Sequence, residues 1–433
     1  MSERTILVWF RNDLRIDDNE ILLEATRKAD KVLPVYLFDP FYFKITPSGT
    51  QKTGSFRAKF LIESVHNLRE NLRAMGSDLL VRVGSPAEVI PALATEFGVN
   101  EVYHHREVAF EETAVSEQVE AALWKIKLNL KHFIGHTLYH KEDLPFPIKD
   151  IPDSFATFRK KIERDSNVRV IAASPEVINT PTIAEPGEIP TLQDLGLEEP
   201  ADDPRDHFHF AGGETVAHQR LQQFFAGYDL ALHSKVKNAN SGSHLSPWLT
   251  FGCMSPRQVY WQSVKHGQKT DARLILELLW RDYFRFMFKK YGNQFFKADG
   301  FKDEAPKVSA DQYALLEQWK SGNTGIPFID ASMHQLAATG YINNYCRQMV
   351  ATYLVKEMQV DWTKGAAYFE EKLIDYSPAS NWGNWAFIAG VGSDPRDNKY
   401  FIPAKPAAAH DPKDDFIQTW LPANGAELDA MAG

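Results

Sequence analysis

The first 140 residues alternate regularly between short apolar runs and amphipathic segments, and this alternation constrains the fold most strongly. The apolar runs predict strands at residues 5–10, 31–38, 78–83, 101–105 and 131–139. The amphipathic segments between them predict helices at residues 19–29, 54–76, 85–98 and 111–126. The order βαβαβαβαβ predicts a doubly wound parallel five-stranded sheet. No G-x-G-x-x-G loop follows the first strand, so a dinucleotide is not expected at that turn.

A different pattern begins after this alternation. Residues 172–205 contain six prolines and few long apolar runs, which predicts an ordered connector rather than a domain. Helical periodicity dominates from about 206 to 424. We therefore expect an α/β domain at 1–140, a connector at 141–205 and a larger all-α domain at 206–433. A chain of 433 residues is too long for one ordinary core, which agrees with this division.

Composition narrows the possible functions. The two cysteines, Cys253 and Cys346, cannot build a disulfide framework or an iron–sulfur site, and we find no metal-ligand spacing or catalytic triad. The N-terminus becomes charged before any apolar run reaches signal-peptide length, and no run approaches about 18 apolar residues, so we expect a cytoplasmic protein. The net charge of −9 means that nucleic-acid binding would require a local basic surface.

The segment 271–291 carries a polar stripe on a largely apolar helical pattern, which predicts a buried helix. Glu277, Trp280, Arg281 and Phe284 fall at i, i+3, i+4 and i+7 and share one stripe. Buried charges are costly unless they are paired. An internal Glu277–Arg281 ion pair explains this stripe as well as a ligand-facing surface does.

A second helical segment, 341–358, has a polar face that contains Asn344, Arg347, Gln348 and the small Ala351. Solvent exposure would explain this face, but the adjoining residues are too apolar for a freely solvated helix. The second stripe therefore favours a binding site over the two structural explanations, an internal ion pair on the first helix and solvent exposure on the second.

The stretch YSPASNWGNWAF at 376–387 concentrates amides and indoles. An ion pair between Asp375 and Arg347 would close one side of a pocket, in which Asn381 offers an amide to a planar heterocycle. Trp385 lies one turn beyond Asn381 if the stretch is helical. Core packing is the commoner fate of Trp385 and of Trp362 in VDWTKG, but a buried Asn needs hydrogen-bond partners.

The loop NSGSHLSPWLTFG at 240–252 combines small residues with a helix start. Ser246-Pro247 predicts an N-cap followed by the first helical residue. Exposed N–H groups and hydroxyls before such a helix suit a phosphate, although most capped helices bind only water.

Five longer motifs follow one another along the chain, namely LVWFRNDLRIDDNEIL, HTLYHKEDLPFPIKDIPDSFATFRKKIE, LLWRDYFRFMFKKYGNQFF, NTGIPFIDASMHQL and SNWGNWAFIAGVGSDPRDNKYF. Together they resemble the photolyase/cryptochrome family, and most closely its cryptochrome DASH branch. The similarity is collinear from residue 5 to about 422. It implies an N-terminal α/β antenna domain and a C-terminal helical domain that holds FAD in a U-shaped conformation.

The resemblance assigns two sets of residues. Positions that match flavin contacts are Tyr228, Gly242, Ser243, His244, Leu245, Ser246, Glu277, Arg281, Asn344, Arg347, Asp375, Ser377 and Asn381. Positions that match contacts with a flipped-out cyclobutane pyrimidine dimer are Glu277, Trp280, Asn344 and Gln348, with Phe387 as a further aromatic residue on the pocket wall. Asn381 would face the flavin N5, where hydrogen bonding helps to decide which reduced state persists.

The implied reaction is the light-driven repair of a deoxyribodipyrimidine photo-lyase. Reduced FAD, excited directly or through an antenna chromophore, passes an electron to the dimer, the cyclobutane ring splits and the electron returns. Catalytic roles are implied for Glu277, Asn344, Asn381, Trp385 and Trp362. The expected partner is ultraviolet-damaged DNA, preferentially single-stranded or looped, because the branch that this chain resembles flips dimers poorly out of duplex DNA; a damaged dinucleotide is still cheaper to extrude than intact bases. We expect a monomer.

Three positions depart from the family pattern. Trp385 and Trp362 match the inner and middle residues of the family's photoreduction chain, but the outer position falls near Ser309, so electrons would enter slowly or through another aromatic such as Tyr313. Ser377 replaces the second acid of the usual Asp-x-Asp pair. His244 stands where this branch commonly carries Lys, which would make a phosphate contact pH dependent.

The antenna and the biological role remain open at this point. Glu112 resembles a position that contacts methenyltetrahydrofolate in relatives, with Glu111 as an alternative alignment; folate, a deazaflavin or no chromophore would each fit. The main rival to repair is a blue-light photoreceptor that signals through a flavin redox change. Ser309 and Ser377 favour this rival, whereas the chain ends about a dozen residues after TWLP, without a long signalling tail. A flavoprotein that binds nucleic acid for structural reasons is a third reading, and the dimer-contacting set argues against it.

Overall fold

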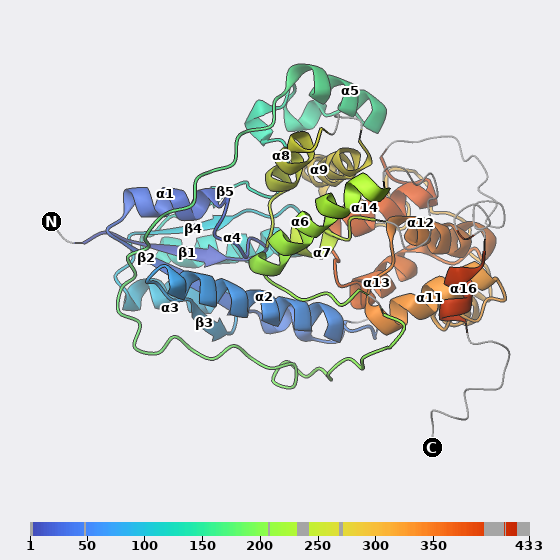
Figure 1. Ribbon diagram of the computed structural model, residues 1–433, viewed down its shortest axis with the longest axis horizontal. Helices are drawn as coiled ribbons and strands as arrows, with labels where there is room; N and C mark the ends of the chain where they lie inside the picture. Colours follow the sequence, from blue (N-terminus) through green and yellow to red (C-terminus); the bar gives the residue numbers. More distant parts are fainter. Residues whose placement is uncertain are drawn as a thin grey trace.

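The computed structural model describes residues 3–46, 49–206, 208–231, 242–267, 272–393, 411 and 413–421, except the side chains of 227–231. The sheet with its helices forms one end of the molecule, and most of the helical part forms the other (Figure 1). No helix among the described residues combines the length and apolar character needed to cross a membrane.

The N-terminal part is a five-stranded sheet in which every pairing is parallel. Its strands, in the spatial order β3-β2-β1-β4-β5, are β1 (Thr5–Phe10), β2 (Lys31–Phe38), β3 (Leu80–Val83), β4 (Glu101–His105) and β5 (Leu130–Phe133). The intervening helices are α1 (Glu20–Lys28), α2 (Ser55–Ala74), α3 (Pro86–Glu96) and α4 (Phe110–Lys125). The predicted doubly wound sheet is therefore confirmed.

Both faces of the sheet are buried, as the continuous apolar strands require. Ile6 and Val8 of β1 share a core with buried residues of α1 and α2. Leu7 and Trp9, which alternate with them, share a second core with residues of α3 and α4. The period of two along β1 thus assigns one pair of helices to each face.

One strand is shorter than the sequence predicts. The apolar run at 131–139 suggested a single strand, but β5 ends at Phe133. Leu138 and Tyr139 instead donate their backbone N–H groups to the Asp282 carboxylate, each at 2.9 Å. Because this buried carboxylate on α9 (Arg273–Tyr291) captures both N–H groups, the chain leaves the sheet and crosses to the helical part.

The C-terminal part contains no strand among its described residues, which confirms the prediction of an all-helical domain. Its helices, besides α9, are α6 (Glu214–Ala231), α7 (Ser246–Thr250), α8 (Pro256–Lys265), α10 (Gln312–Lys320), α11 (Pro327–Thr339), α12 (Asn344–Thr352), α13 (Trp362–Lys372), α14 (Pro378–Ala389) and α16 (Asp415–Trp420). A π-helical turn at Tyr353–Glu357 continues α12.

The predicted connector contains two short 3-10 helices, Lys141–Asp143 and Ile148–Asp150, and one α-helix, α5 (Phe155–Asp165), which packs against α9. The described residues between α5 and α6 form no helix or strand, and Figure 1 shows this segment passing the end of the sheet and then running alongside α2. Backbone bonds hold it, since Val32 N donates to Asn179 O at 2.7 Å and Val81 N to Pro186 O at 2.8 Å. The exact domain boundaries stay a prediction.

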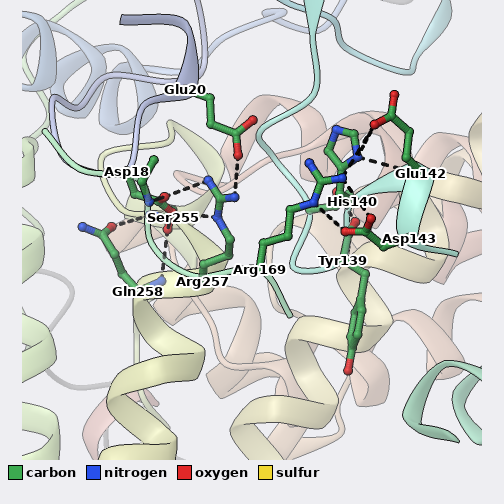
Figure 2. Close-up of polar contacts among 12 residues, drawn as sticks. Asp18, Glu20, Tyr139, His140, Glu142, Asp143, Arg169, Ser255, Arg257 and Gln258 are labelled. Atoms are coloured by element: carbon green, nitrogen blue, oxygen red, sulfur yellow. Dashed lines mark hydrogen bonds and ion pairs between the residues drawn. The ribbon is translucent and has the colours of Figure 1, made fainter. Parts of the chain in front are cut away.

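A buried ionic cluster joins the two parts of the molecule (Figure 2). Arg257 of α8 donates to both carboxylate oxygens of Asp18, at 2.9 and 2.7 Å, and also to Glu20 at 2.6 Å. Ser255 Oγ donates to the same Asp18 at 2.5 Å. Since Asp18 lies in the loop after β1, the cluster fixes α8 against the α/β domain near the carboxyl ends of the strands.

Candidate cofactor and active site

A cavity of about 80 Å³ lies between α12 and α14. Residues of both helices and of the turn before α14 line it, including Asn344, Arg347, Gln348, Ala351, Asp375, Ser377, Asn381, Asn384 and Trp385. The polar face predicted on segment 341–358 therefore points into a cavity. Four amides and an ion pair beside an indole suit a planar ligand with several hydrogen-bonding edges.

The ion pair expected between Arg347 and Asp375 is present. Arg347 Nη2 donates to Asp375 Oδ2 at 2.9 Å, and Arg347 Nε donates to Ile342 O at 2.7 Å. Only 1% of the Asp375 side chain is exposed, and Oδ1 has no hydrogen-bond partner among the described residues. A buried carboxylate oxygen without a donor is costly, so a ligand N–H at this position would relieve the cost.

Asn381 is held in place by the helix next to it. Its Nδ2 donates to Ala366 O of α13 at 2.9 Å, which leaves Oδ1 as the acceptor for a ligand. Its backbone N–H donates to Ser377 O at 2.8 Å, in the first turn of α14. Asn381 and Trp385 lie one turn apart on α14, which confirms that the stretch is helical.

A glycine allows Trp385 to approach α13 closely. A Cβ added at Gly365 would lie 2.4 Å from Cη2 of Trp385, closer than packed atoms approach. Trp385 is 2% exposed, and its ring packs edge-on against Phe369 at 5.2 Å and Trp319 at 6.1 Å between centroids. The indole that borders the cavity is thus fixed by aromatic contacts from α10 and α13.

The loop 242–246 approaches the same ion pair through Tyr341. Tyr341 hydrogen-bonds Ser246, and the guanidinium of Arg347 lies 5.2 Å from the centre of the Tyr341 ring. Burial raises the pKa of Tyr341 to about 12. Ser246 is the first residue of α7 and Leu245 precedes it, so the predicted N-cap at Ser246 is wrong by one residue.

His244 lies among aromatic residues in this loop. Its ring stacks on Phe208 with 4.4 Å between centroids, and its φ of +56° is in the left-handed region. Arg220 of α6 donates to Ser243 O at 2.9 Å. The loop also contains the small Gly242, next to Ser243 and so near the Arg220 guanidinium.

A larger cavity, of about 440 Å³, lies where the carboxyl ends of the strands meet the helical domain. It is lined by Arg11, Lys52, Glu112, Tyr376, Ser377 and Trp382, among others. Tyr376 and Ser377 also line the smaller cavity, so this two-residue segment separates the two spaces. Ser377, which departs from the family pattern, therefore lies in the wall between the two cavities.

Glu112 is buried in the wall of the larger cavity. Its Oε2 accepts from Ala109 N at 3.2 Å, and 8% of the residue is exposed. Burial, and then the negative charge of Glu107, raises the pKa of Glu112 to about 7. This carboxyl can therefore act as either donor or acceptor towards a ligand at neutral pH.

Comparisons with known proteins agree with this architecture. Residues 6–180 match the family model described as DNA photolyase, and residues 274–430 match the model described as the FAD binding domain of DNA photolyase. A cryptochrome DASH of Gloeobacter violaceus is 43% identical over 98% of this chain and 86% of its own length. The chain belongs to the photolyase/cryptochrome family.

Two solved structures support this family assignment. The cryptochrome of Synechocystis sp. PCC6803 has a TM-score of 0.90 and 40% identity, over 98% of this chain and 90% of that one. The archaeal photolyase of Sulfolobus tokodaii, solved with two FAD molecules, has a TM-score of 0.80 and 28% identity, over 96% of this chain and 90% of that one.

FAD is the cofactor of this photolyase/cryptochrome protein, and the cavity chemistry fits it. The unpartnered Oδ1 of Asp375 and the acceptor Oδ1 of Asn381 match a ring system that carries N–H groups. The Arg347 guanidinium, held at Asp375 and Ile342, supplies a fixed donor group on the same wall.

Other residues assigned by the resemblance lie outside the smaller cavity. Arg281 is buried and donates to the backbone oxygens of His136 and Leu249, the latter at 3.0 Å. Burial, together with the neighbouring charge of Arg285, lowers the pKa of Arg281 to about 9. Arg281 therefore joins the segment after β5 to α7, and through α7 it supports the loop 242–246.

The internal Glu277–Arg281 ion pair is wrong. Glu277 accepts from Arg273 Nε at 2.9 Å, one turn earlier on α9, and 40% of its side chain is exposed. Arg273 at the start of α9 is exposed, whereas residues from Leu278 to Phe288 are mostly buried. The helix is thus buried along most of its length, but near its start the partly exposed Glu277 is open to a ligand.

The aromatic residues of the expected substrate wall lie together. Trp280 and Phe387 approach edge to face, with 6.1 Å between ring centroids. Gly383 permits this arrangement, because a Cβ there would lie 2.3 Å from Cδ1 of Phe284 and would push α14 away from α9.

The two tryptophans expected to carry electrons, Trp362 and Trp385, each pack against a different tryptophan. Trp362 packs against Trp382, with 5.8 Å between centroids, and donates Nε1–H to Ala298 O at 3.0 Å. Trp385 packs against Trp319. Ser309 donates its N–H to Gln359 O, and Tyr313 is 67% exposed beneath Lys364. The side chain of Tyr228 lies outside the described residues.

Sequence reasoning missed several residues of both cavities. Arg11 follows β1 directly, so its position at the carboxyl end of a strand could have indicated it. Lys52 had no such signal, because only the fold brings its Nζ to 2.6 Å from Glu111 and 3.0 Å from Glu370.

One further group has the composition of a metal site. The ligand atoms of Asp17, Glu214 and His218 lie within 4.8 Å of one another, and the i, i+4 spacing of the last two could have indicated it. Both oxygens of Glu214 already accept backbone N–H groups, from Ile16 and Asp17 at 2.9 Å. We assign no metal to this group.

Proposed function

We propose that this protein is a light-dependent FAD enzyme that repairs cyclobutane pyrimidine dimers, preferentially in single-stranded or looped DNA. The observation that supports this most strongly is the cavity in which the pair of Arg347 with the buried Asp375 meets the amides of Asn344, Gln348 and Asn381 beside Trp385. When bound and reduced, FAD supplies the excited electron that opens the cyclobutane ring and takes it back.

The chain's own residues bind and orient in this proposal. Arg347 and Asp375 fix one edge of the isoalloxazine, and Asn381 presents its carbonyl oxygen to the ring from α14. The loop Gly242 to Ser246 holds the phosphate part, with Arg220 as a nearby cation. The buried position of Asp375 and Trp385 keeps water away from the reacting face.

The substrate would meet the open side of α9 and α12. Trp280 and Phe387 form an aromatic corner on which pyrimidine rings stack, and base–aromatic stacking is favourable for any base. Asn344 and Gln348 offer amides to the base edges, and the exposed carboxylate of Glu277 accepts from a base N–H. A neutral amide can read a base edge without adding charge near the phosphates.

We also propose an antenna chromophore in the larger cavity, with methenyltetrahydrofolate as the first candidate. Glu112 would accept from the N–H groups of its pterin ring, and Arg11 and Lys52 supply positive charge to a carboxylated tail. The volume of about 440 Å³ is in the range of small-molecule sites. The proposal further includes a cytoplasmic monomer.

The rival function is a blue-light photoreceptor that signals through a flavin redox change. Ser309 at the outer position of the photoreduction chain, with Trp362 packed on Trp382 instead of on Trp385, favours it to some extent. Repair remains the preferred function, because a receptor has no need of the substrate corner at Trp280 and Phe387.

The test uses ultraviolet-treated oligothymidine. Under blue light with a reductant, the protein should restore the absorbance of the thymine band, and it should fail to do so in the dark. If light changes the redox state of the flavin but leaves the oligonucleotide unchanged, the repair proposal is overturned in favour of the photoreceptor.

A further inference from the structure

The indole of Trp280 contacts four aromatic rings, of which Phe155 and Tyr283 also contact each other. Phe155 stacks face to face on it, with 3.6 Å between centroids and an interplanar angle of 11°. Tyr283 meets it edge-on at 5.7 Å and 87°, and meets Phe155 edge-on at 5.6 Å. Such pairs favour defined ring orientations. The three rings therefore form one unit, hereafter the Trp280 stack.

Phe155 is itself firmly anchored. It is 6% exposed and begins α5, and the residues just before it are tied to the far end of α9. Lys290 Nζ donates to Ile151 O and to Asp153 Oδ1, both at 2.7 Å. Tyr291 Oη donates to the same carboxylate at 2.6 Å, and Tyr283 Oη donates to Asp153 O.

This anchoring has a consequence for Trp280. One face of the indole is covered by Phe155, so a planar ligand can stack only on the opposite face. Without Phe155 the indole could rotate, because the groove between α5 and α9 that Phe155 and Trp280 both line is open and holds about 770 Å³. The other two rings in contact with the indole are Phe284, tilted at 31°, and Phe387, which meets it at 63°.

We propose that Phe155 is a positioning residue that sets the single stacking face of Trp280 for a damaged pyrimidine. This inference rests on the proposed repair function. Phe155 does not touch the substrate; it acts through Trp280, by preventing the indole from turning into the groove. The Trp280 indole is already ordered in the free protein. Binding of the dimer therefore loses less free energy to the ordering of this side chain.

The test compares Phe155→Leu with Phe155→Tyr. Leucine keeps apolar bulk but removes the ring, and tyrosine keeps the ring. We expect Phe155→Leu to weaken binding of a dimer-containing oligothymidine by about three- to tenfold, as expected for the loss of one aromatic pair. Phe155→Tyr should restore the affinity of the unaltered protein. The repair rate at saturating oligonucleotide and the flavin content should not change, so the effect appears in KM rather than in kcat.

A matched control separates positioning from general destabilisation. Phe288 and Phe295 form another buried face-to-face stack, with 4.3 Å between centroids and an angle of 8°. Phe295→Leu should reduce thermal stability about as much as Phe155→Leu but leave dimer affinity unchanged. Equal losses of dimer affinity in both variants would overturn the positioning role.

Failure of this inference and failure of the repair function give different results. If the unaltered protein repairs dimers and Phe155→Leu binds them equally well, only the positioning role is overturned. If the unaltered protein neither binds nor repairs dimers, the repair function and the positioning role fall together.

Discussion

Arg347 and Asp375 form an ion pair of 2.9 Å in which the carboxylate keeps its second oxygen, Oδ1, buried and without a donor among the described residues. The pair links α12 to the turn before α14, and so it connects the two walls of the cavity. In a purely structural ion pair, both carboxylate oxygens accept hydrogen bonds from protein groups, as those of Asp18 do from Arg257 and Ser255. This difference separates a binding site from a structural clamp.

The first prediction concerns this pair. Asp375→Asn should strip the protein of flavin and lower its unfolding free energy by about 3 kcal/mol, because the Arg347 charge stays partly buried without its partner. Flavin absorbance per protein and denaturant unfolding measure both effects. Asp165→Asn is the control, since its pair with Arg164 is exposed. A variant that stays fully yellow would remove Asp375 from the flavin site.

The second prediction concerns the exposed carboxylate of α9. Glu277→Ala should weaken dimer binding while the protein stays yellow, because its surface pair with Arg273 adds only about 0 to 1 kcal/mol. Glu24→Ala, which breaks a comparable i, i+4 pair with Lys28, is the control and should not affect dimer binding. Loss of flavin colour in Glu277→Ala would show a structural role instead.

The third prediction is a pH dependence at Glu112. Its folded-state pKa of about 7 exceeds the ordinary value of 4.5, so the folded protein holds the proton more tightly than the unfolded chain. This contribution to stability is complete below the ordinary pKa and is lost as pH rises towards and through about 7. Above that window, the folded protein carries a buried negative charge on Glu112 next to Glu107.

Glu112→Gln removes this titration. Relative to the unaltered protein, the variant should gain unfolding free energy between about pH 5 and about pH 8, by an amount on the order of 3 kcal/mol. Denaturant unfolding at both pH values measures the change. Glu117→Gln, on the exposed side of α4, should show no such trend. A difference independent of pH would contradict the assigned burial of Glu112.

The fourth prediction concerns Trp362. Trp362→Phe should slow light-driven reduction of the flavin but spare dimer repair by chemically reduced protein, since the proposed electron path runs through this indole and the indole does not line the cavity. Transient absorption after blue-light excitation measures the rate. Trp124→Phe changes an indole that is 68% exposed on the α/β domain and serves as the control. An unchanged rate in Trp362→Phe would exclude it from the electron path.

The fifth prediction concerns the clamp between domains. Asp18→Asn should lower the unfolding free energy by about 3 kcal/mol, because Arg257 would remain buried with only Glu20 as a carboxylate partner. Asp143→Asn, whose pair with Arg169 is partly exposed, should have a much smaller effect (Figure 2). Equal effects would mean that burial does not govern the strength of these pairs.

The sequence by itself determined the parallel sheet, the helical second domain and the shared face of Asn344, Arg347 and Gln348. Periods of 2 and 3.6 residues are properties of a single strand or helix, so they can be read without knowing what the element packs against.

Only the tertiary structure decided which partner each polar or aromatic group found. Glu277 paired with Arg273 instead of Arg281, β5 ended where Asp282 captured the next N–H groups, and Phe155 came to lie on Trp280, 125 positions away in the chain. These contacts depend on how separate elements dock. Docking is set by the burial of whole faces, and no short stretch of sequence records it.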